Sequence, residues 1–258
     1  MRKLLFANAA VLAVTLAAPA IAADLPMKSE VPYAAPRFSW TSCYVGGSLG
    51  GGIARKDMTD PVQLVQDSFI FPGATTGVTT ASTSPTGAVI GGQIGCDYEF
   101  PSSMVVGVEG SALGSTMKGS TSVGLPLGNP DIGLMQANTD FLASVTARVG
   151  YAFDNVLLYA KGGAALAGDK YNVSGTFTGL PYDFQGLDNR YGWIVGGGVD
   201  WAFARHWSVN VEYDYYSFGH GGILMADSIN GFTGVVDVKQ TVQVVKVGLN
   251  FHIWGSGW

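Results

Sequence analysis

Charged residues are scarce in this chain, and so are cysteine and histidine. Only 13% of its 258 residues are charged, two are Cys and three are His. Scattered His and Cys residues do not make a preformed metal site. Acidic residues outnumber basic ones by 19 to 14, so the basic surface that nucleic-acid binding needs is missing. The sequence therefore predicts no metal site, no cofactor and no nucleic-acid partner.

Long hydrophobic runs are also missing, except at the N-terminus. The apolar stretch Leu4–Ala18 follows the basic residues Arg2 and Lys3 and precedes the small-x-small motif Ala20-Ile21-Ala22. This order predicts a secretory signal peptide over residues 1–22, which is cleaved. The alternative is a membrane anchor, but the apolar run is short for a span of ~20 residues.

The rest of the chain is apolar in composition, although no other segment indicates a membrane helix. Mean hydropathy is +0.25, and 37 residues are Gly. Residues 23–39 contain three prolines without periodicity, which predicts an extended periplasmic tail rather than a plug-like segment. Residues 40–258 then form one domain with the composition of an outer-membrane β-barrel. A soluble β-sandwich is the alternative, but it would usually carry more charge.

Alternation of apolar and polar or glycine residues is the main structural pattern. In TGAVIGGQIGCDYEF, apolar residues from Ala88 to Phe100 share one face, and Gly, Gln, Asp and Glu share the other. Such strands suit a barrel whose outside meets lipid. Eight strands are predicted, at about 40–52, 86–100, 104–117, 138–152, 156–168, 190–203, 207–217 and 238–254.

The predicted connections alternate between short and long. The short ones are 101–103, 153–155 and 204–206, and the long ones are about 53–85, 118–137, 169–189 and 218–237. Short periplasmic turns and long extracellular loops are typical of outer-membrane barrels. The sequence thus predicts an all-β fold: an eight-stranded antiparallel transmembrane β-barrel in a Gram-negative outer membrane, with both termini periplasmic.

Aromatic residues gather at both ends of the predicted strands, as two girdles at the membrane interfaces would require. The turn-side group is Trp40, Tyr98, Phe100, Tyr151, Phe153, Trp201, Phe203, Trp207, Phe251 and Trp254. The loop-side group is Phe141, Tyr171, Tyr191, Trp193, Tyr215 and Phe218.

Several segments together resemble a known family. FSWTSCYVGGSLGGG, GAVIGGQIGCDYEF, VVGVEGSALGS, ASVTARVGYAF, LLYAKGGAAL and WIVGGGVDWAF are similar to segments of small alphaproteobacterial outer-membrane β-barrel proteins. That group includes the major immunogenic surface proteins of Brucella, Bartonella and rhizobia and, more distantly, barrels of the OmpA/OmpX type. The resemblance implies surface exposure, a role in envelope integrity and sometimes host interaction through the loops. The partners it implies are outer-membrane lipids and lipopolysaccharide, the assembly machinery and a possible extracellular or host ligand.

The C-terminus departs from the pattern of such barrels, which commonly end on an aromatic residue that the assembly machinery recognises. Phe251 continues the outward apolar series of the last strand, whereas Trp258 ends the chain after Gly255 and Gly257. Both Phe251 and Trp258 are candidates for the assembly signal.

Charged residues are predicted on the inner face of the barrel. They are Glu109, Asp140, Arg148, Lys161, Asp200, Glu212, Asp214 and Lys246. An eight-stranded interior is only wide enough for side chains to fill, so these charges should pair with one another. The alternative is a gate or a narrow ion path.

The two cysteines fall near the turn-side ends of neighbouring strands. Cys43 and Cys96 both face lipid in the predicted pattern, so a cross-strand disulfide is plausible. The alternative is two unpaired cysteines one register step apart.

A lipid-modifying enzyme would need a nucleophile and a base near the outer leaflet. The only local candidates are Ser217 and His220, with Asp214 or Glu212 to orient the base, and no nucleophile motif surrounds Ser217. Glycine-rich pieces such as GGSLGGG lack the Lys-Ser/Thr of a phosphate loop. No catalytic or cofactor-binding residue is therefore predicted. A surface protein that contributes to envelope integrity is the first interpretation, a narrow passive channel the second and a lipid-modifying enzyme a distant third.

Overall fold

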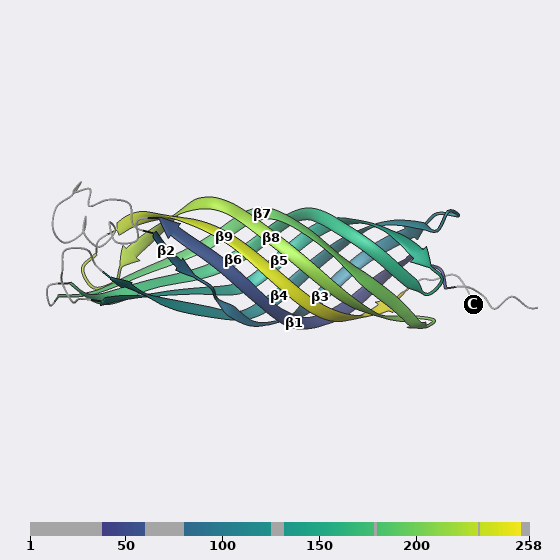
Figure 1. Cartoon of the computed structure of the whole chain (residues 1–258), viewed down its shortest axis with the longest axis horizontal. Coiled ribbons are helices and arrows are strands. Elements are labelled where there is room, and N and C mark those ends of the chain that lie inside the picture. The colour runs from purple at the N-terminus through teal and green to yellow at the C-terminus, as the bar shows by residue number, and fades with distance from the viewer. Residues whose placement is uncertain (1–37, 60–79, 125–131, 178–179, 232, 254–258) are drawn as a thin grey trace, which may run out of the picture. The chain divides into compact units, whose positions relative to one another are not determined.

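One antiparallel sheet makes up the computed structural model of the protein, which describes residues 38–59, 80–124, 132–177, 180–231 and 233–253 (Figure 1). Its strands are β1 (Ser42–Thr59), β2 (Thr80–Thr83), β3 (Thr86–Glu99), β4 (Met104–Gly124), β5 (Ile132–Phe153), β6 (Val156–Phe177), β7 (Leu180–Ala204), β8 (Trp207–Asp227) and β9 (Thr233–His252). No helix in these ranges is long and apolar enough to cross a membrane. The predicted signal peptide and residues 23–37 of the predicted tail lie outside the described residues.

The sheet closes into a ring because β1 is hydrogen-bonded to β3 on one side and to β9 on the other. The short strand β2 pairs with the far end of β1 on the same side as β3. Ser84 and Pro85 separate β2 from β3, and proline has no N–H to donate to a ladder. These two strands therefore share one position in the ring, and the predicted eight-stranded barrel is confirmed.

Side chains alternate between a buried inner face and an exposed outer face. Along β9 every second residue from Val236 to His252 is buried, and those between them are exposed or half-buried. The outer face is apolar over the middle of the wall, where Ile90 is 70% exposed and Val145 is 69% exposed. A surface of this kind is unfavourable in water and is suited to lipid.

The two ends of the barrel differ in their connections. At one end, here called the turn end, residues 100–103, 154–155 and 205–206 connect consecutive strands, which confirms the predicted short turns. At the opposite end, here called the loop end, only 178–179 separate β6 from β7, and 228–232 separate β8 from β9.

The loop-end connections are shorter than predicted because the strands continue far into the segments 118–137, 169–189 and 218–237. The β6–β7 ladder runs without a break to Phe177 and Leu180. These segments are rich in Gly, Ser, Thr and Asn, and their outward residues mix polar side chains with apolar ones such as Leu187 and Leu224, so they lack the regular lipid-facing pattern that identifies strands. The connection at 60–79 lies outside the described residues.

Two aromatic girdles mark the membrane-spanning part of the wall. On β5, Phe141 and Tyr151 lie ten residues apart on the outer face, and on β7, Tyr191 and Trp201 have the same spacing. A barrel strand needs ~9–11 residues to cross a bilayer. The spans therefore end near Phe141 and Tyr191, and the wall beyond them at the loop end extends past the lipid.

Three aromatic residues predicted for the girdles lie inside the barrel instead. Trp40, Tyr171 and Phe218 are buried, with exposed fractions of 0%, 3% and 6%. Tyr171 and Phe218 each lie an even number of residues from inward-facing residues of their strands, so they also face inward. Trp40 precedes β1 and covers the interior at the turn end. Clustering near strand ends was therefore insufficient to assign them to a membrane interface.

The cysteines lie at directly opposed positions. Cys43 of β1 pairs in register with Cys96 of β3, and a disulfide joins their sulfur atoms across a sequence separation of 53. Such a bond stabilises mainly by restricting the unfolded chain. It joins β1 to β3, between which the chain runs through the connection at 60–79 and the short strand β2.

The last strand carries one of the two candidate assembly residues. Phe251 faces outward from β9, and its ring centroid lies 5.1 Å from that of Trp207. Trp258 lies outside the described residues. The choice between them stays a prediction.

Glycine is required where neighbouring strands approach most closely. A Cβ atom at Gly91 would lie 2.0 Å from the carbonyl oxygen of Ala112, whereas at Gly47 the nearest atom would be 3.8 Å away. We expect Gly91→Ala to lower the free energy of unfolding by about 1–3 kcal/mol, because the backbone of β4 must move. Gly47→Ala should leave it nearly unchanged. Urea titration of each variant folded into lipid vesicles measures both, and equal effects would contradict this steric account.

Candidate functional site

A network of buried charges crosses the interior in the half of the barrel nearer the turn end. We call it the central charge network; its members are Asp97, Glu109, Arg148, Lys161, Glu212, Asp214 and Lys246. All are at most 6% exposed. Inward-facing positions of β3, β4, β5, β6, β8 and β9 supply them. The network therefore spans most of the ring.

Lys161 lies at the centre of the network. Its ammonium group is 2.9 Å from Glu109 Oε1 and 3.3 Å from Asp214 Oδ1, and it also contacts Glu212 Oε1. Lys246 lies 2.9 Å from Glu212 and 3.1 Å from Asp214. Two ammonium groups thus share two carboxylates from one strand, which offsets part of the cost of burying them.

Arg148 forms the other half of the network with two tyrosines. Its guanidinium group lies 3.3 Å from Glu109 and 3.4 Å from Asp97, and 4.0 Å from the ring centroid of Tyr159. Tyr44 accepts a hydrogen bond from Arg148 and donates one of 2.6 Å to Glu109. These contacts add β1 to the connected strands.

A second polar layer lies nearer the loop end. Lys56 Nζ is 2.8 Å from Asp169 Oδ1, which also accepts hydrogen bonds from Thr139 at 2.6 Å and Gln240 at 3.2 Å. Arg190 donates to the carbonyl oxygen of Val238 at 2.6 Å. The layer therefore joins strands through both side-chain and backbone acceptors.

Apolar layers separate the polar ones, as the inward residues of β9 show. From the turn end these residues run Lys246, then Val244 and Val242, then Gln240, then Val238 and Val236. Each valine pair belongs to a separate cluster of buried hydrophobic residues to which several strands contribute. The described interior is thus filled by alternating polar and apolar layers.

The turn end is closed by a third apolar cluster around Trp40. The indole Nε1 donates to the carbonyl oxygen of Asp154 at 3.2 Å, and Phe38 packs edge-on against the ring with centroids 4.8 Å apart. His252 lies beneath them, between the hydroxyl groups of Ser42 and Ser208 at 2.7 and 2.9 Å. This histidine is buried among polar partners.

Seven of the eight charges predicted for the interior are buried there, and one is not. Asp140 was assigned to the inner face, but it faces outward and pairs with Lys170 at 2.7 Å. The β5–β6 register shifts between Thr139 and Phe141, so Asp140 occupies a bulge. A bulge adds one residue and reverses the parity beyond it, which a strict period-two pattern does not anticipate.

Other interior charges were missed. Lys56 and Asp169 fall in segments that the sequence assigned to loops, so no inward face was considered for them. Asp97 was not among the predicted interior charges either, yet it joins the network at 3.4 Å from Arg148. Asp200, which was predicted, is buried outside the network and accepts a hydrogen bond from Asn250 at 3.3 Å. Asp97 was recognisable, since it lies on the polar face of its strand.

The residues considered for an enzyme do not come together. His220 is exposed and pairs with Asp237 at 3.1 Å, while Glu212 and Asp214 bind lysines inside the barrel. Among the described residues, no group of three or more His, Cys, Asp or Glu side chains is arranged to hold a metal ion.

The loop end is held by hydrogen bonds around Asp183, which lies beyond the girdle. Its carboxylate accepts bonds from Gln185 at 2.8 Å, Asn172 at 2.6 Å and Ser228 at 3.1 Å. The hydrogen bond from Gln185, followed by that from Asn172, holds the pKa of Asp183 below its usual value. The carboxylate therefore remains an acceptor that connects the β6–β7 and β8–β9 hairpins.

Removing the central cation should strongly destabilise the barrel. Lys161→Met removes a positive charge beside the buried carboxylates of Glu109 and Glu212, so their negative charges are less well neutralised. We therefore expect the free energy of unfolding to fall by about 3–5 kcal/mol. Arg55→Met is the control, because Arg55 pairs with Asp57 on an exposed surface, where such a pair contributes at most about 1 kcal/mol. Urea titrations in lipid vesicles compare the two, and equal losses would contradict a structural role for the network.

Comparison with known proteins agrees with this architecture. Residues 8–251 match the family model described as outer membrane protein beta-barrel domain. The chain is 28% identical over 251 residues to the 31 kDa outer-membrane immunogenic protein of Brucella melitensis, covering 93% of this chain and 96% of that protein. It is 26% identical over 259 residues to the 25 kDa outer-membrane immunogenic protein of Brucella abortus, covering 97% and 98%.

A solved structure is also similar. The outer membrane protein OprG of Pseudomonas aeruginosa matches with a TM-score of 0.44 and 14% identity, over 82% of this chain and 97% of that one. The family match covers nearly the whole sequence, from the N-terminal region to the end of β9. The chain therefore belongs to the outer membrane protein beta-barrel domain family and resides in the outer membrane of a Gram-negative bacterium.

Proposed function

We propose that this outer-membrane surface protein acts through its loop end, and that it neither conducts ions nor catalyses a reaction. The observation that carries the proposal is the filled interior, with alternating polar and apolar layers along β9. A barrel that is closed inside meets its surroundings through its outer wall and its ends. The protein then contributes to envelope integrity and to surface interactions.

The extended wall supports the loop end as the interacting part. Strand β7 continues from Tyr191 to Leu180, beyond the girdle. Exposed apolar side chains stand on the extended wall, where Leu187 of β7 is 77% exposed and Leu224 of β8 is 64% exposed. Relatives named outer-membrane immunogenic proteins agree with exposure at the cell surface. An extracellular or host ligand is the partner we infer for it.

A passive channel is less well supported. Ions would have to pass Val242 and Val244 and then Val236 and Val238, which are at most 2% exposed within apolar clusters. The charged residues between these layers already contact one another. An enzyme is also less well supported, because His220 is paired with Asp237 and directed away from the buried carboxylates.

Conductance tests the closed interior. We expect the refolded mature protein to give no reproducible single-channel steps in a planar bilayer, because the apolar layers exclude a continuous file of water. Lys161→Ala and Glu212→Ala should be recorded beside it. Salt-dependent steps in the parent protein that either substitution alters would make the interior a conducting path and refute this part of the proposal.

Labelling of intact cells tests which end faces outward. Ser228 lies in the β8–β9 connection at the loop end, and Ser102 lies in a turn at the other end; both are exposed. We expect a membrane-impermeant maleimide to label Ser228→Cys on intact cells and Ser102→Cys only after lysis. The disulfide-bonded native cysteines provide the unlabelled background. Labelling of Ser102→Cys on intact cells would reverse the orientation.

A further inference from the structure

The wall of the barrel has an open seam between β7 and β8, which begins at the girdle and runs toward the loop end. Trp193 is opposed by Ser217 at one end of the seam, and Gln185 by Ala226 at the other. Between these pairs no ladder joins residues 186–192 to residues 218–225, all of which the structure describes. Along the same stretches β7 stays paired with β6, and β8 stays paired with β9 except at one bulge. Two strand edges therefore face each other across the seam without ladder hydrogen bonds.

A mismatch in strand length keeps the seam open. From Gln185 to Trp193 the chain advances eight residues along β7, whereas the opposed positions are nine residues apart along β8. The extra residue is accommodated at the bulge, where the β8–β9 register shifts between Ser217 and Gly219, and Gly219 has a φ of +64°. A bulge bends its strand and increases the local twist. Strand β8 therefore diverges from β7 and remains with β9.

The open part of the seam is short, because the two strands approach each other again at its ends. A Cβ atom added at Gly192 would lie 2.2 Å from the carbonyl oxygen of Ser217, and one added at Gly186 would lie 3.2 Å from that of Leu224. The free edges are therefore residues 187–191 of β7 and 219–223 of β8. In an extended strand, alternate residues direct their N–H and C=O groups to the same side, so each edge presents donors and acceptors to the seam.

A buried arginine crosses the seam in place of the missing ladder. Arg190 of β7 is only 5% exposed, and its Nη2 donates to the carbonyl oxygens of Gly221 at 3.0 Å and Val238 at 2.6 Å. Its Nε lies 2.8 Å from Asp188, whereas its Nη1 has no hydrogen-bond partner among the described residues. An unpaired buried donor is costly, and a further carbonyl oxygen would relieve that cost. The seam thus retains unused hydrogen-bonding capacity.

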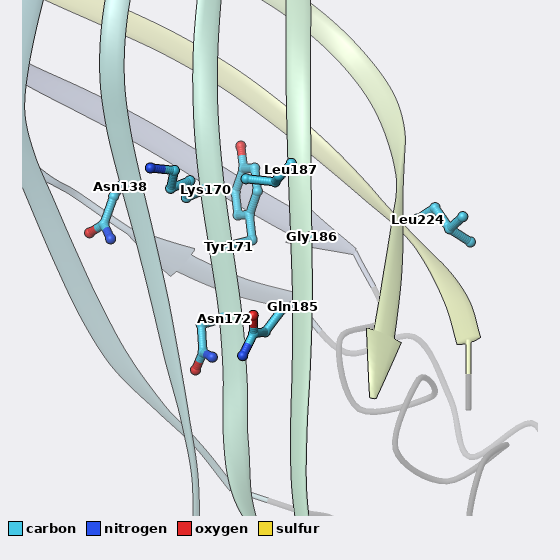
Figure 2. Close-up of a pocket in the computed structure, with 8 residues that line it drawn as sticks. All are labelled: Asn138, Lys170, Tyr171, Asn172, Gln185, Gly186, Leu187 and Leu224. Atoms are coloured by element: carbon cyan, nitrogen blue, oxygen red, sulfur yellow. The ribbon is translucent and has the colours of Figure 1, made fainter. Parts of the chain in front are cut away.

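Apolar side chains stand on the outer face at both edges of the seam. Leu187 lies on β7, while Leu224 of β8 is opposed in register by Val235 of β9, which is 69% exposed. A hollow of about 610 Å³ reaches from one edge to the other, since its lining includes Gly186, Leu187 and Leu224 (Figure 2). Figure 2 shows the two leucines on strands that stand apart. Exposed apolar residues beside an open strand edge are typical of a site where another chain binds.

Charged side chains beside the seam compensate one another. Lys170 of β6, which is opposed in register by Leu187, lies 2.7 Å from Asp140, and Arg190 pairs with Asp188. These ion pairs leave no net charge to select a phosphate or another anion. The groups that the seam leaves unpaired belong mainly to the main chain. An extended polypeptide presents matching donors and acceptors at the same spacing.

We propose that a short extended segment of another protein binds in the seam as an added β-strand. Its main chain pairs with the edges at 187–191 and 219–223, which corresponds to about five residues or ~17 Å of extended chain. Its apolar side chains pack on Leu187 and Leu224. In recognition by strand addition, main-chain hydrogen bonds supply affinity and alternate side chains supply specificity. The inference rests on the proposed function, because it names the class of partner that the loop end binds.

A second copy of the chain fits the seam less well. Its own β7 and β8 are each paired on their other side, so neither is free to add a strand to this barrel. A two-fold symmetric contact would press the leucines of the two copies together outside the wall and leave the edges of both seams unpaired. A free extended segment of a different protein has no such constraint.

Hydrogen–deuterium exchange of the refolded mature protein tests the seam itself. We expect the seam-facing amides of 187–191 and 219–223 to exchange faster than the amides of 134–139 and 169–174, which lie at the same height of the wall in an unbroken β5–β6 ladder. Equally slow exchange in both regions would show that the seam is closed and would overturn the proposal.

Peptide binding tests the occupant. The probes are short peptides in which Val, Leu, Ile or Phe alternates with Thr, with one Lys and one Glu at the ends for solubility. We expect at least one sequence to bind saturably and to slow exchange at the seam alone. Methylation of alternate peptide nitrogens, in either frame, should weaken binding about tenfold, since losing one or two main-chain hydrogen bonds corresponds to about that factor.

A pair of double variants separates the seam from the rest of the loop end. Leu187→Lys with Leu224→Lys places charges at both edges and should weaken binding of the same peptide about tenfold, because charged side chains on a strand edge oppose strand addition. Leu134→Lys with Leu180→Lys is the matched control, since it adds the same charges at exposed leucines in paired positions of β5 and β7. Heat-modifiable gel mobility verifies that every variant is folded.

Several further results would overturn the proposal. They are no saturable binding by any of the peptides, equal binding of the methylated peptides, and equal losses in the two double variants. A peptide-free dimer with protected seam amides, broken by the Leu187→Lys and Leu224→Lys pair, would identify a second copy as the occupant instead. Maleimide labelling of Ser228→Cys and Ser102→Cys reports orientation separately, so failure of the proposed function remains distinguishable.

Discussion

Closure of the backbone hydrogen-bond ring is the constraint on which the rest of the structure depends. A hydrocarbon layer offers no water to pair with an exposed strand edge, so β1 must bond to β9 as well as to β3. With eight positions in the ring, the interior is only wide enough for side chains. Everything that faces inward must therefore be apolar or find a polar partner, and the layers around Lys161 and Asp169 meet that requirement.

The outer face contacts lipid along one part of the barrel and water along another. Between the girdles lipid surrounds the wall, and its outward residues are apolar. Beyond Phe141 and Tyr191 the wall meets water, so outward residues such as Lys170 and Gln185 become polar, while Phe184 and Val238 still pack inside. The loop end thus resembles a water-soluble barrel built on a membrane barrel. The outer wall therefore changes from apolar to polar near Phe141 and Tyr191, and the water-exposed surface lies at the loop end.

Much of the fold could be predicted because lipid makes strand patterns readable. Alternation identified the wall between the girdles, and the short turns followed from the lengths of the gaps. The same method failed beyond the girdle, where polar and apolar side chains are mixed on the outer face, as Lys170 and Leu187 show, and the pattern of the strands resembles that of loops. It also failed at Asp140, where a bulge between Thr139 and Phe141 breaks the parity. Both failures occur where lipid no longer determines which residue faces out.

By itself the sequence determined the class of fold, the membrane-spanning strands, the inner face of most charged residues and the shared outer face of the two cysteines, because period two assigns each side chain to one side of the wall. That the cysteines stand directly opposite each other was decided by the register between β1 and β3. Only the tertiary structure decided which charges meet, since Glu109, Lys161 and Glu212 come from strands far apart in the chain. It also decided the stacking of apolar layers and the hollows outside, because these depend on the register between neighbouring strands and on where bulges shift it.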